Sequence, residues 1–301
     1  EAEVVIAGGT ETMSRMLYYL DPSVRAHPLR MGDKPLFDAF THGVTIVQPS
    51  KLYPNLNMGL TAENVAKRCH ITREEQDAFA YDSQMKYKAA YEAGRFKDEI
   101  VPYEVKTRKG SFVFDTDEHP KLDCTIEGLA KLKPAFLRDG TGTVTAGNAS
   151  GMNDGASAVV VMSEEKAQAM GVQPLVRIVS SASAGVDPSV MGLGPVPAIQ
   201  KALKKAGLKL EDMDLIELNE AFAAQSLGCL KELGMDMGTE MYQRVNVNGG
   251  AIAHGHALGN SGTRLLCTLI YEMKRRKSRY GLAALCIGGG QGLAMIIENV
   301  I

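Results

Sequence analysis

The sequence predicts an α/β protein with a layered core. Two observations lead to this prediction: strand-like and helix-like segments alternate after Thr143, and the run Ala158–Val161 is apolar at every position rather than at every second one. Continuous apolar strands are typical of sheets that are covered on both faces. With 301 residues, 45% of them hydrophobic, the chain is long enough for one large domain or for two to three smaller ones.

The first part of the chain predicts a strand, an irregular lobe and two helices. Val4–Ala7 has the pattern of a core strand. Between residues 17 and 51, prolines interrupt any hydrophobic periodicity of a helix or strand. We therefore expect loops and short elements there, in an inserted lobe. A helix is expected over 61–69, and Thr72–Glu75 has the form of a capping box that opens a long helix ending at Gly94. The buried side of this long helix is expected to carry Ala78, Tyr81, Met85 and Ala89.

The rest of the chain alternates between the two kinds of element. Short strand-like pieces at 102–134 are assigned to the same lobe. Later strands are expected at 157–162, 175–180, 214–218, 245–247, 284–287 and 293–297. Helices are expected at 163–171, 195–207, 220–234 and 261–276. The stretches Val5–Gly9 and Leu285–Gly289 resemble each other, which is compatible with two copies of one fold.

Composition excludes several classes of protein. The formal net charge is −2, from 33 basic and 35 acidic residues, so the chain lacks the basic field that nucleic acid or an anionic membrane surface would need. No run approaches the roughly 18 apolar residues of a membrane span. The five cysteines are unclustered, which indicates reduced thiols and a cytoplasmic or organelle-matrix setting. The six histidines show no spacing typical of a metal site.

The segment Asn246–Arg264 is the first of four that point to chemistry. Its glycines allow positive φ angles and a close backbone approach to a ligand, just before a helix whose free amides can face an anion. His256 lies inside this segment. The alternative is a glycine-rich turn with a surface histidine. His254 is interpreted as a bystander.

The second segment is Leu285–Gly292, a strand end with Cys286 and a glycine turn. Successive N–H groups beside the thiol would stabilise negative charge on a thioester oxygen. The alternative is that Cys286 is a buried small apolar residue.

The third segment, Asn219–Gln225, joins a strand to a helix, and Asn219 could simply cap that helix. The fourth, Ala146–Ala156, is a loop of small residues that could be only a tight connection.

Together and in this order, the four segments resemble signatures of the thiolase family, namely NASG, NEAF, GGAIAxGHPxGxSG and CxGGGxG. Gly8–Ser14 is similar to a fifth family stretch, AGGxExMS, and the acetyl-CoA acetyltransferase branch is the most similar. The resemblance runs from residue 1 to residue 301. It implies a five-layered αβαβα fold of two similar halves with an inserted loop lobe, N-terminally incomplete. Residues 1–21 and 153–174 would belong to the first half, 22–152 to the lobe that covers coenzyme A, and 175–301 to the second half.

The resemblance also implies roles for individual residues. His256 would activate a nucleophilic cysteine and help to hold a thioester oxygen, and Asn219 would position a water in the same oxyanion hole. Cys286 would be the acid/base thiol, with a reactivity that depends on a tuned thiolate pKa. The Gly288 amide would supply half of a second oxyanion hole. The expected substrate contacts are Met58 and Phe222 at the acyl group, Ser150, Ala149 and Met152 at the pantetheine arm, and Lys121 at the nucleotide.

The activity implied is thiolytic cleavage of a 3-ketoacyl-CoA, or Claisen condensation of two acetyl-CoA molecules to acetoacetyl-CoA and CoA. Coenzyme A thioesters would be substrates, and no tightly bound cofactor is expected. The family habit implies a homo-oligomer, either a dimer or a tetramer. A decarboxylating ketoacyl synthase is disfavoured because such enzymes have a second histidine where this sequence has Cys286.

Three departures from the family pattern bear on these expectations. The family's nucleophilic cysteine lies upstream of the stretch that here is Gly8–Ser14, and no cysteine precedes Cys69. We therefore expect a truncated chain, a separate cysteine-bearing segment, or a noncatalytic acyl-CoA-binding subunit or inactive remnant. Ala257 replaces the proline that usually follows the histidine, which would loosen the loop. Asn57 replaces a histidine often found before Met58, which leaves the acyl chain length open.

Overall fold

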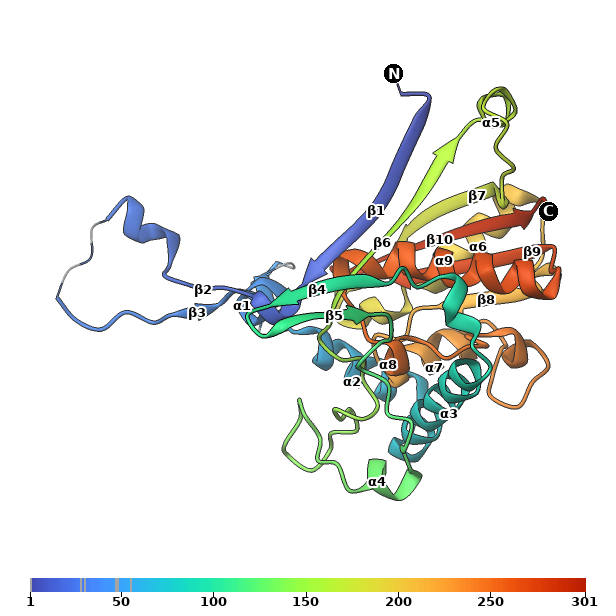
Figure 1. Cartoon of the computed structure of the whole chain (residues 1–301). Helices are drawn as coiled ribbons and strands as arrows, with labels where there is room; N and C mark the ends of the chain where they lie inside the picture. Colours follow the sequence, from blue (N-terminus) through green and yellow to red (C-terminus); the bar gives the residue numbers. More distant parts are fainter. Residues whose placement is uncertain (1, 28, 30, 47–48, 55) are drawn as a thin grey trace.

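The computed structural model describes residues 2–27, 29, 31–46, 49–54 and 56–301 (Figure 1). The strands are β1 (Val4–Thr12), β2 (Tyr18–Tyr19), β3 (Phe37–Asp38), β4 (Tyr103–Thr107), β5 (Gly110–Phe114), β6 (Asp154–Met162), β7 (Val176–Gly185), β8 (Leu215–Leu218), β9 (Tyr280–Cys286) and β10 (Gln291–Asn299). The α-helices are α1 (Ala39–Ile46), α2 (Met58–Cys69), α3 (Arg73–Glu92), α4 (Ile126–Ala130), α5 (Glu164–Ala169), α6 (Pro195–Ala206), α7 (Ala223–Glu232), α8 (Ala251–His254) and α9 (Leu258–Arg276). The predicted alternation of strands and helices is thus confirmed.

A four-stranded sheet forms the centre of the molecule, and we call it the covered sheet. Its strand order is β7-β10-β9-β8; β8 runs parallel to β9, and the other pairs are antiparallel. Helix α6 packs on one face and α9 on the other, and each face has its own buried cluster. Ile199 and Ile296 belong to the first cluster, and Leu265 and Ile297 belong to the second. Helices therefore cover both faces in the middle of this sheet, whereas β7 and the start of β10 are more open: Ile178 is 49% exposed and Leu293 is 36% exposed.

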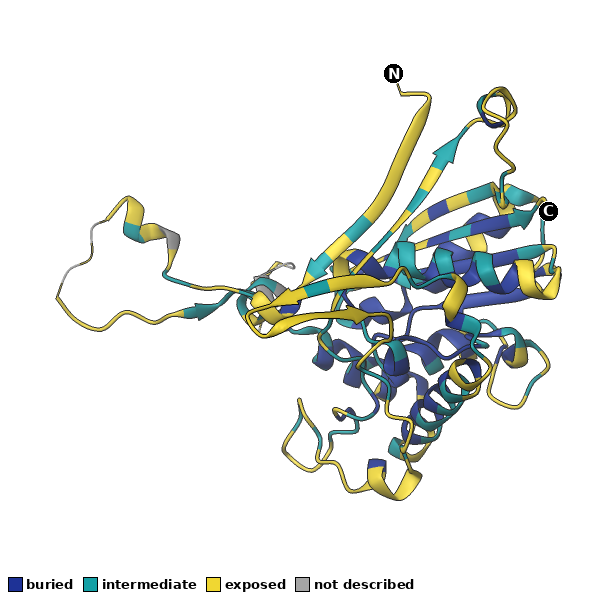
Figure 2. Cartoon of the chain, in the orientation of Figure 1, coloured by how far each residue is buried: buried dark blue, intermediate teal, exposed yellow. Residues whose placement is uncertain are grey.

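The second sheet has two strands, β1 and β6, paired antiparallel from Val4↔Met162 to Thr12↔Asp154, and we call it the ribbon. Helix α9 packs against both its strands as well as against the covered sheet, so it lies between the two sheets. The other face of the ribbon is open, and Figure 2 shows the exposed residues along it. Ile6 is 76% exposed and its partner Val160 is 61% exposed.

Two predictions about the ribbon are therefore wrong. Val4–Ala7 is a strand but not a core strand, and the continuous apolar run Ala158–Val161 is not covered on both faces. An apolar sequence shows only which surface a strand can bury. How much is buried depends on the elements that pack against it, and here α9 covers one face.

Helix α3 begins with the predicted capping box, but its buried stripe is not the predicted one. Thr72 accepts a hydrogen bond from the backbone N–H of Glu75, and the Glu75 carboxylate accepts one from that of Thr72. The side chains at 78, 81, 85 and 89 are only partly buried or exposed. The buried positions are Gln76, Asp77, Phe79, Ala80, Ser83, Gln84, Tyr87 and Ala90. Asp77, Ser83 and Gln84 are buried there because they form hydrogen bonds with loops of the site described below. Hydrophobic periodicity cannot predict such contacts.

Other differences concern the boundaries of elements. The expected strand at 245–247 is a turn with one bridge, Ile216↔Val245, because Asn246 adopts φ +45°. Helix α7 begins at Ala223 rather than at 220, and α9 begins at Leu258 rather than at 261. The short helices α1 and α8 were not expected, and neither was α4 within the stretch 102–134 that was predicted as turns and strand-like pieces.

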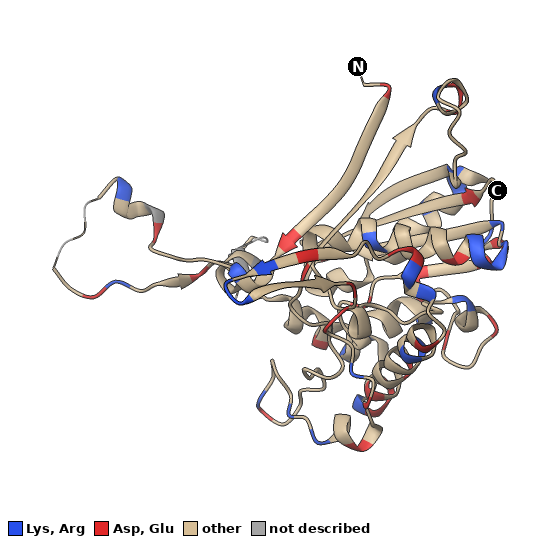
Figure 3. Ribbon diagram, in the orientation of Figure 1, with Lys and Arg blue, Asp and Glu red and all other residues tan. Residues whose placement is uncertain are grey.

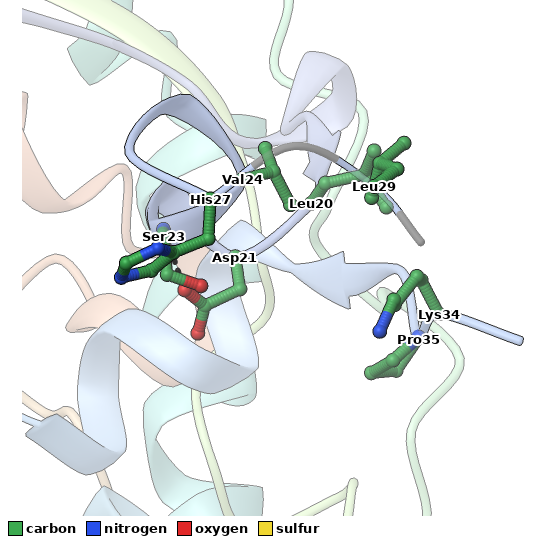
Figure 4. Close-up of a pocket in the computed structure, with 8 residues that line it drawn as sticks. All are labelled: Leu20, Asp21, Ser23, Val24, His27, Leu29, Lys34 and Pro35. Atoms are coloured by element: carbon green, nitrogen blue, oxygen red, sulfur yellow. Dashed lines mark hydrogen bonds between the residues drawn. The ribbon is translucent and has the colours of Figure 1, made fainter. Parts of the chain in front are cut away.

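The excursion predicted between residues 17 and 51 contains β2, β3, a 3₁₀ turn and α1, and it projects from the body (Figure 1). Residues 28, 30, 47 and 48 of this stretch lie outside the described ranges. Its loop encloses a hollow of about 270 Å³ (Figure 4). The side chains that line this hollow are Leu20, Asp21, Ser23, Val24, His27, Leu29, Lys34 and Pro35.

Charges of both signs are interspersed over the body, as Figure 3 shows. None of the helices in the described ranges is both long enough and apolar enough to cross a membrane. Within those ranges, no three His, Cys, Asp or Glu side chains are grouped so that they could hold a metal ion.

Candidate active site

The site lies where β8 and β9, two neighbouring parallel strands, end. Asn219 follows β8, and Cys286 is the last residue of β9. The Asn219 backbone N–H donates to the Ala284 carbonyl over 2.9 Å, so the two strand ends are in register. Parallel strands place their carboxyl ends at one edge, which brings residues 67 positions apart in the sequence to the same place.

Asn219 faces His256 across this edge. The Asn219 Nδ2 atom lies 3.3 Å from His256 Nε2, and Asn219 is fully buried. Its Oδ1 atom has no hydrogen-bond partner among the described residues. Helix α7 begins at Ala223 with Phe222 as N-cap, so the interpretation of Asn219 as a simple helix cap is wrong.

The loop that carries His256 is bonded to the segment before β6. His256 forms a parallel bridge with Met152, and its backbone N–H donates to Asn153 Oδ1 over 3.2 Å. Gly255 adopts φ +96°, and a Cβ added there would lie 2.5 Å from the Asn153 side chain, so glycine is required at this position. The glycine-rich segment around His256 and the small-residue loop are thus packed together and joined by backbone hydrogen bonding.

The imidazole of His256 is neutral at pH 7. Burial lowers its pKa to about 4, and the nearby positive charge of Arg264 acts in the same direction. Its other nitrogen, Nδ1, lies 2.6 Å from the hydroxyl of Ser261 on α9. A neutral imidazole can accept a proton from a nucleophile, as a general base must. This geometry disfavours the interpretation of His256 as a surface histidine.

Cys286 lies in a small apolar cluster with Met191 and Ala221, against which Met58 and Phe222 pack. It is 7% exposed, and burial raises the pKa of its thiol to about 11. In this structure the thiol is therefore protonated at neutral pH and is poised to donate a proton. As a base, it would need a bound substrate or a neighbouring group to favour the thiolate.

A glycine turn follows Cys286 directly. Gly288, Gly289 and Gly290 have φ angles of +86°, +59° and +87°, values that residues with side chains rarely adopt. The turn is closed by a hydrogen bond from the Gln291 N–H to the Gly288 carbonyl, 3.1 Å long. Gly288 thus lies in a tight turn two residues after Cys286, and its expected part in a second oxyanion hole stays a prediction.

The small-residue loop approaches the same edge from the other side. Ala149 and Phe222 form an antiparallel bridge, and the Ser150 backbone N–H and hydroxyl both donate to the Ala221 carbonyl over 3.0 Å. Met152 is 70% exposed, so it lies at the rim. Ala149 and Ser150 therefore lie beside Ala221 and Phe222, which pack in the apolar cluster around Cys286.

Lys121 is exposed and lies farther out. Its backbone N–H donates to Gln84 of α3 over 2.9 Å. Two residues before it, His119 packs so closely on Gly151 that a Cβ added to Gly151 would lie 2.3 Å from the ring. The segment that carries Lys121 thus borders the small-residue loop at Gly151.

A buried polar network, centred on Glu220, supports the site. The Glu220 carboxylate accepts hydrogen bonds from Ser83 on α3, from Asn246 and from the Ile252 backbone N–H. Asn246 also bonds the N–H and the carbonyl of Leu218, the residue before Asn219. Burial raises the pKa of Glu220. This network fixes the strand end and the glycine-rich loop relative to each other.

Sequence reasoning assigned no role to several residues that the structure brings to the site. Met191, from the 3₁₀ turn Pro188–Leu193, packs against Cys286, and no local pattern marks it. Asn153 and Ser261 lie inside segments that the sequence singles out, yet only their contacts with His256 reveal what they do. His254 packs between Tyr87 and Phe96 and does not reach the site, in agreement with its interpretation as a bystander.

Comparisons with known proteins identify one family. Residues 1–165 match the family model for the N-terminal domain of thiolase, and residues 172–299 match that for the C-terminal domain. The chain is 52% identical to an acetyl-CoA acetyltransferase of Syntrophomonas wolfei over 99% of its own length and 73% of the relative's. It is 53% identical to an acetyl-CoA acetyltransferase of Escherichia coli over 100% of its own length and 73% of the relative's.

Solved structures give the same result. The crystal structure of human mitochondrial 3-ketoacyl-CoA thiolase is 48% identical in sequence, with a TM-score of 0.91, over 99% of this chain and 72% of that one. A crystal structure of the same human enzyme in complex with CoA is 47% identical, with a TM-score of 0.90, over 100% of this chain and 72% of that one.

Proposed function

The chain belongs to the thiolase family, and from this premise we propose that it transfers acyl groups between coenzyme A thioesters, by thiolytic cleavage of 3-ketoacyl-CoA or by the reverse Claisen condensation. The predicted thiolase fold is confirmed by the TM-scores of about 0.9. The expectation of a missing or separate nucleophile segment gains no support from the comparisons and is not part of the proposal.

The observation that carries the proposal is the convergence of three chemically distinct groups on one strand edge. His256 and Asn219 lie 3.3 Å apart, and Cys286 ends the neighbouring strand. An uncharged base, a buried amide and a buried thiol are the groups that a Claisen-type reaction at a thioester uses.

Each group has a part in the proposed reaction. In cleavage, the Nε2 atom of His256 accepts the proton of the thiol that attacks the 3-keto carbon of the substrate. The new C–S bond replaces the C2–C3 bond, which breaks, and the imidazolium donates a hydrogen bond to the thioester oxygen of the departing acetyl-CoA carbanion. Asn219, with its free Oδ1, holds a water that completes this oxyanion site. In cleavage, the Cys286 thiol gives its proton to the α-carbon of the departing acetyl-CoA carbanion. In synthesis, the Cys286 thiolate removes that proton.

The surroundings of Cys286 suit the acyl end of a substrate. Met58, Phe222 and Met191 line the apolar cluster beside the thiol, and Ser150 with Ala149 and Met152 stands at its entrance for the pantetheine arm. Lys121, at the outer edge, is proposed to meet the nucleotide. We also propose that residues 22–152 form the lobe over coenzyme A, between a first half at 1–21 and 153–174 and a second half at 175–301.

Substitution of Cys286 tests this function. In an assay of acetoacetyl-CoA thiolysis, Cys286→Ala and His256→Ala should each lower kcat by roughly 100- to 10,000-fold, the usual contribution of a general acid or base. Cys267→Ala is the matched control, because this partly buried thiol lies on α9 near Ala158 and outside the site, and its kcat should stay within about twofold of the wild type. A fully active Cys286→Ala variant would disprove the proposal, and a wild type that binds CoA without turnover would identify a noncatalytic binding subunit.

A further inference from the structure

The two ring nitrogens of His256 have different surroundings. Nε2 faces the buried amide of Asn219 at 3.3 Å, and Nδ1 faces the hydroxyl of Ser261 at 2.6 Å. A neutral imidazole carries one proton, and only the nitrogen without it can act as a base. The direction of the hydrogen bond to Ser261 therefore decides which nitrogen is basic.

The Ser261 hydroxyl has its own proton engaged elsewhere. It donates to the Ala257 carbonyl over 2.9 Å, one turn back along α9. A hydroxyl has one proton to donate and two lone pairs to accept with. Toward His256, it can therefore only accept, which places the imidazole proton on Nδ1 and the lone pair on Nε2. Asn219 agrees with this assignment, because the amide nitrogen is the atom that faces Nε2.

We propose that Ser261 is a positioning residue that holds His256 in the Nδ1–H form, so that its basic Nε2 atom points to Asn219 and the strand edge. The inference rests on the function proposed above. When Nε2 takes up a proton, the same hydroxyl continues to accept from Nδ1 and supports the imidazolium. Ser261 touches no substrate in this scheme and acts only through the ring.

The position of Ser261 makes the arrangement rigid. Ser261 is 2% exposed, and its backbone N–H also bonds the Ala257 carbonyl over 2.9 Å. The side chain that accepts from Nδ1 is thus fixed to the first turn of a 19-residue helix. The replacement of proline by alanine at 257 leaves this contact intact, because the contact uses the backbone carbonyl.

A purely structural role is the competing explanation, since serine hydroxyls often bond the carbonyl four residues earlier in a helix. The two explanations differ in what happens to the ring. If Ser261 only supports the helix, its loss lowers stability and leaves the tautomer of His256 unchanged. If it positions the ring, its loss lets the proton move to Nε2.

The experiment is long-range ¹H–¹⁵N NMR of the histidine side chains in the full chain near pH 7, with the His256 signals identified by their absence in His256→Asn. We expect a protonated Nδ1 in the wild type, a shift toward protonated Nε2 in Ser261→Ala, and wild-type signals in Ser261→Thr. Ser226→Ala is the matched control, because Ser226 is a buried helical serine whose hydroxyl has no partner in the described structure. Its spectrum should equal that of the wild type.

Kinetics provide a second readout. Ser261→Ala should lower kcat for thiolysis by roughly 10- to 100-fold, by analogy with the groups that orient metal-bound histidines through their second nitrogen, with little change in KM. The inference is overturned by a protonated Nε2 in the wild type, or by an unchanged tautomer in Ser261→Ala. If Ser261→Ala does not fold, the wild-type spectrum alone still decides. If the tautomer responds as expected but His256→Ala keeps full activity, the proposed function fails and the positioning of the ring stands.

Discussion

The covered sheet and the ribbon both contain runs of apolar strand residues, but these residues have different surroundings. Ile296 in β10 is fully buried, whereas Ile6 in β1 is 76% exposed. The difference lies in the elements that pack against them: α6 and α9 cover the two faces in the middle of the covered sheet, where Ile296 lies, and α9 covers one face of the ribbon. Apolar residues in a strand thus contribute to stability only as far as other elements remove them from water.

The comparison also explains where the chemistry is found. Asn219 and Cys286 follow strands of the covered sheet, and a buried network fixes their backbone. The ribbon contributes through the segment just before it, where Met152 and Asn153 contact the His256 loop. The covered sheet therefore carries Asn219 and Cys286, and its junction with the ribbon holds His256.

The largest expected effect contrasts one isoleucine from each sheet. Ile296→Ala should lower the free energy of unfolding by about 2–5 kcal/mol, because it leaves a cavity in a closed core. Ile6→Ala should lower it by less than about 1 kcal/mol, since its side chain is already in water. Urea unfolding of both variants measures the difference. Equal losses would mean that another element covers the ribbon in solution.

A smaller effect concerns the junction between the two regions, and it depends on pH. The pKa of His256 is about 4 in the folded protein and about 6.5 when unfolded, so between these values only the unfolded chain takes up the proton. The stability associated with the neutral ring is fully present above pH 6.5. It is lost as pH falls toward 4, by at most about 3 kcal/mol.

The variant His256→Asn isolates this contribution, because it removes the titrating group and leaves the other histidines in place. Between pH 7 and pH 4, the wild type should lose more stability than the variant, measured by urea unfolding at each pH. Parallel curves would show that the ring titrates normally in the folded state.

The smallest expected effect is at Ala257, next to the same junction. Its φ of −74° is close to the value that a proline ring imposes, and His256 before it is in an extended bridge. Ala257→Pro should therefore raise the free energy of unfolding by about 0.4–1 kcal/mol through the lower entropy of the unfolded chain. A thermal melt measures the change, and a loss of stability would show that the Ala257 N–H is needed as a donor.

Much of the site follows from sequence segments, and the remainder from contacts between them. The glycines around His256 and after Cys286 predict positive φ angles, and Gly255 and Gly288 have positive φ angles in the structure. Met191 and Ser261 carry no such signal. Their importance lies in what they touch, and the residues that they touch are 95 and 5 positions away.

The sequence by itself determined the alternation of strands and helices, the capping box of α3 and the segments that bear His256, Asn219 and Cys286, because local periodicity and glycine placement act over a few residues. The tertiary structure alone decided which strands are covered, which face of α3 is buried and which nitrogen of His256 faces Ser261. Burial and hydrogen bonding depend on partners that the fold supplies from distant parts of the chain.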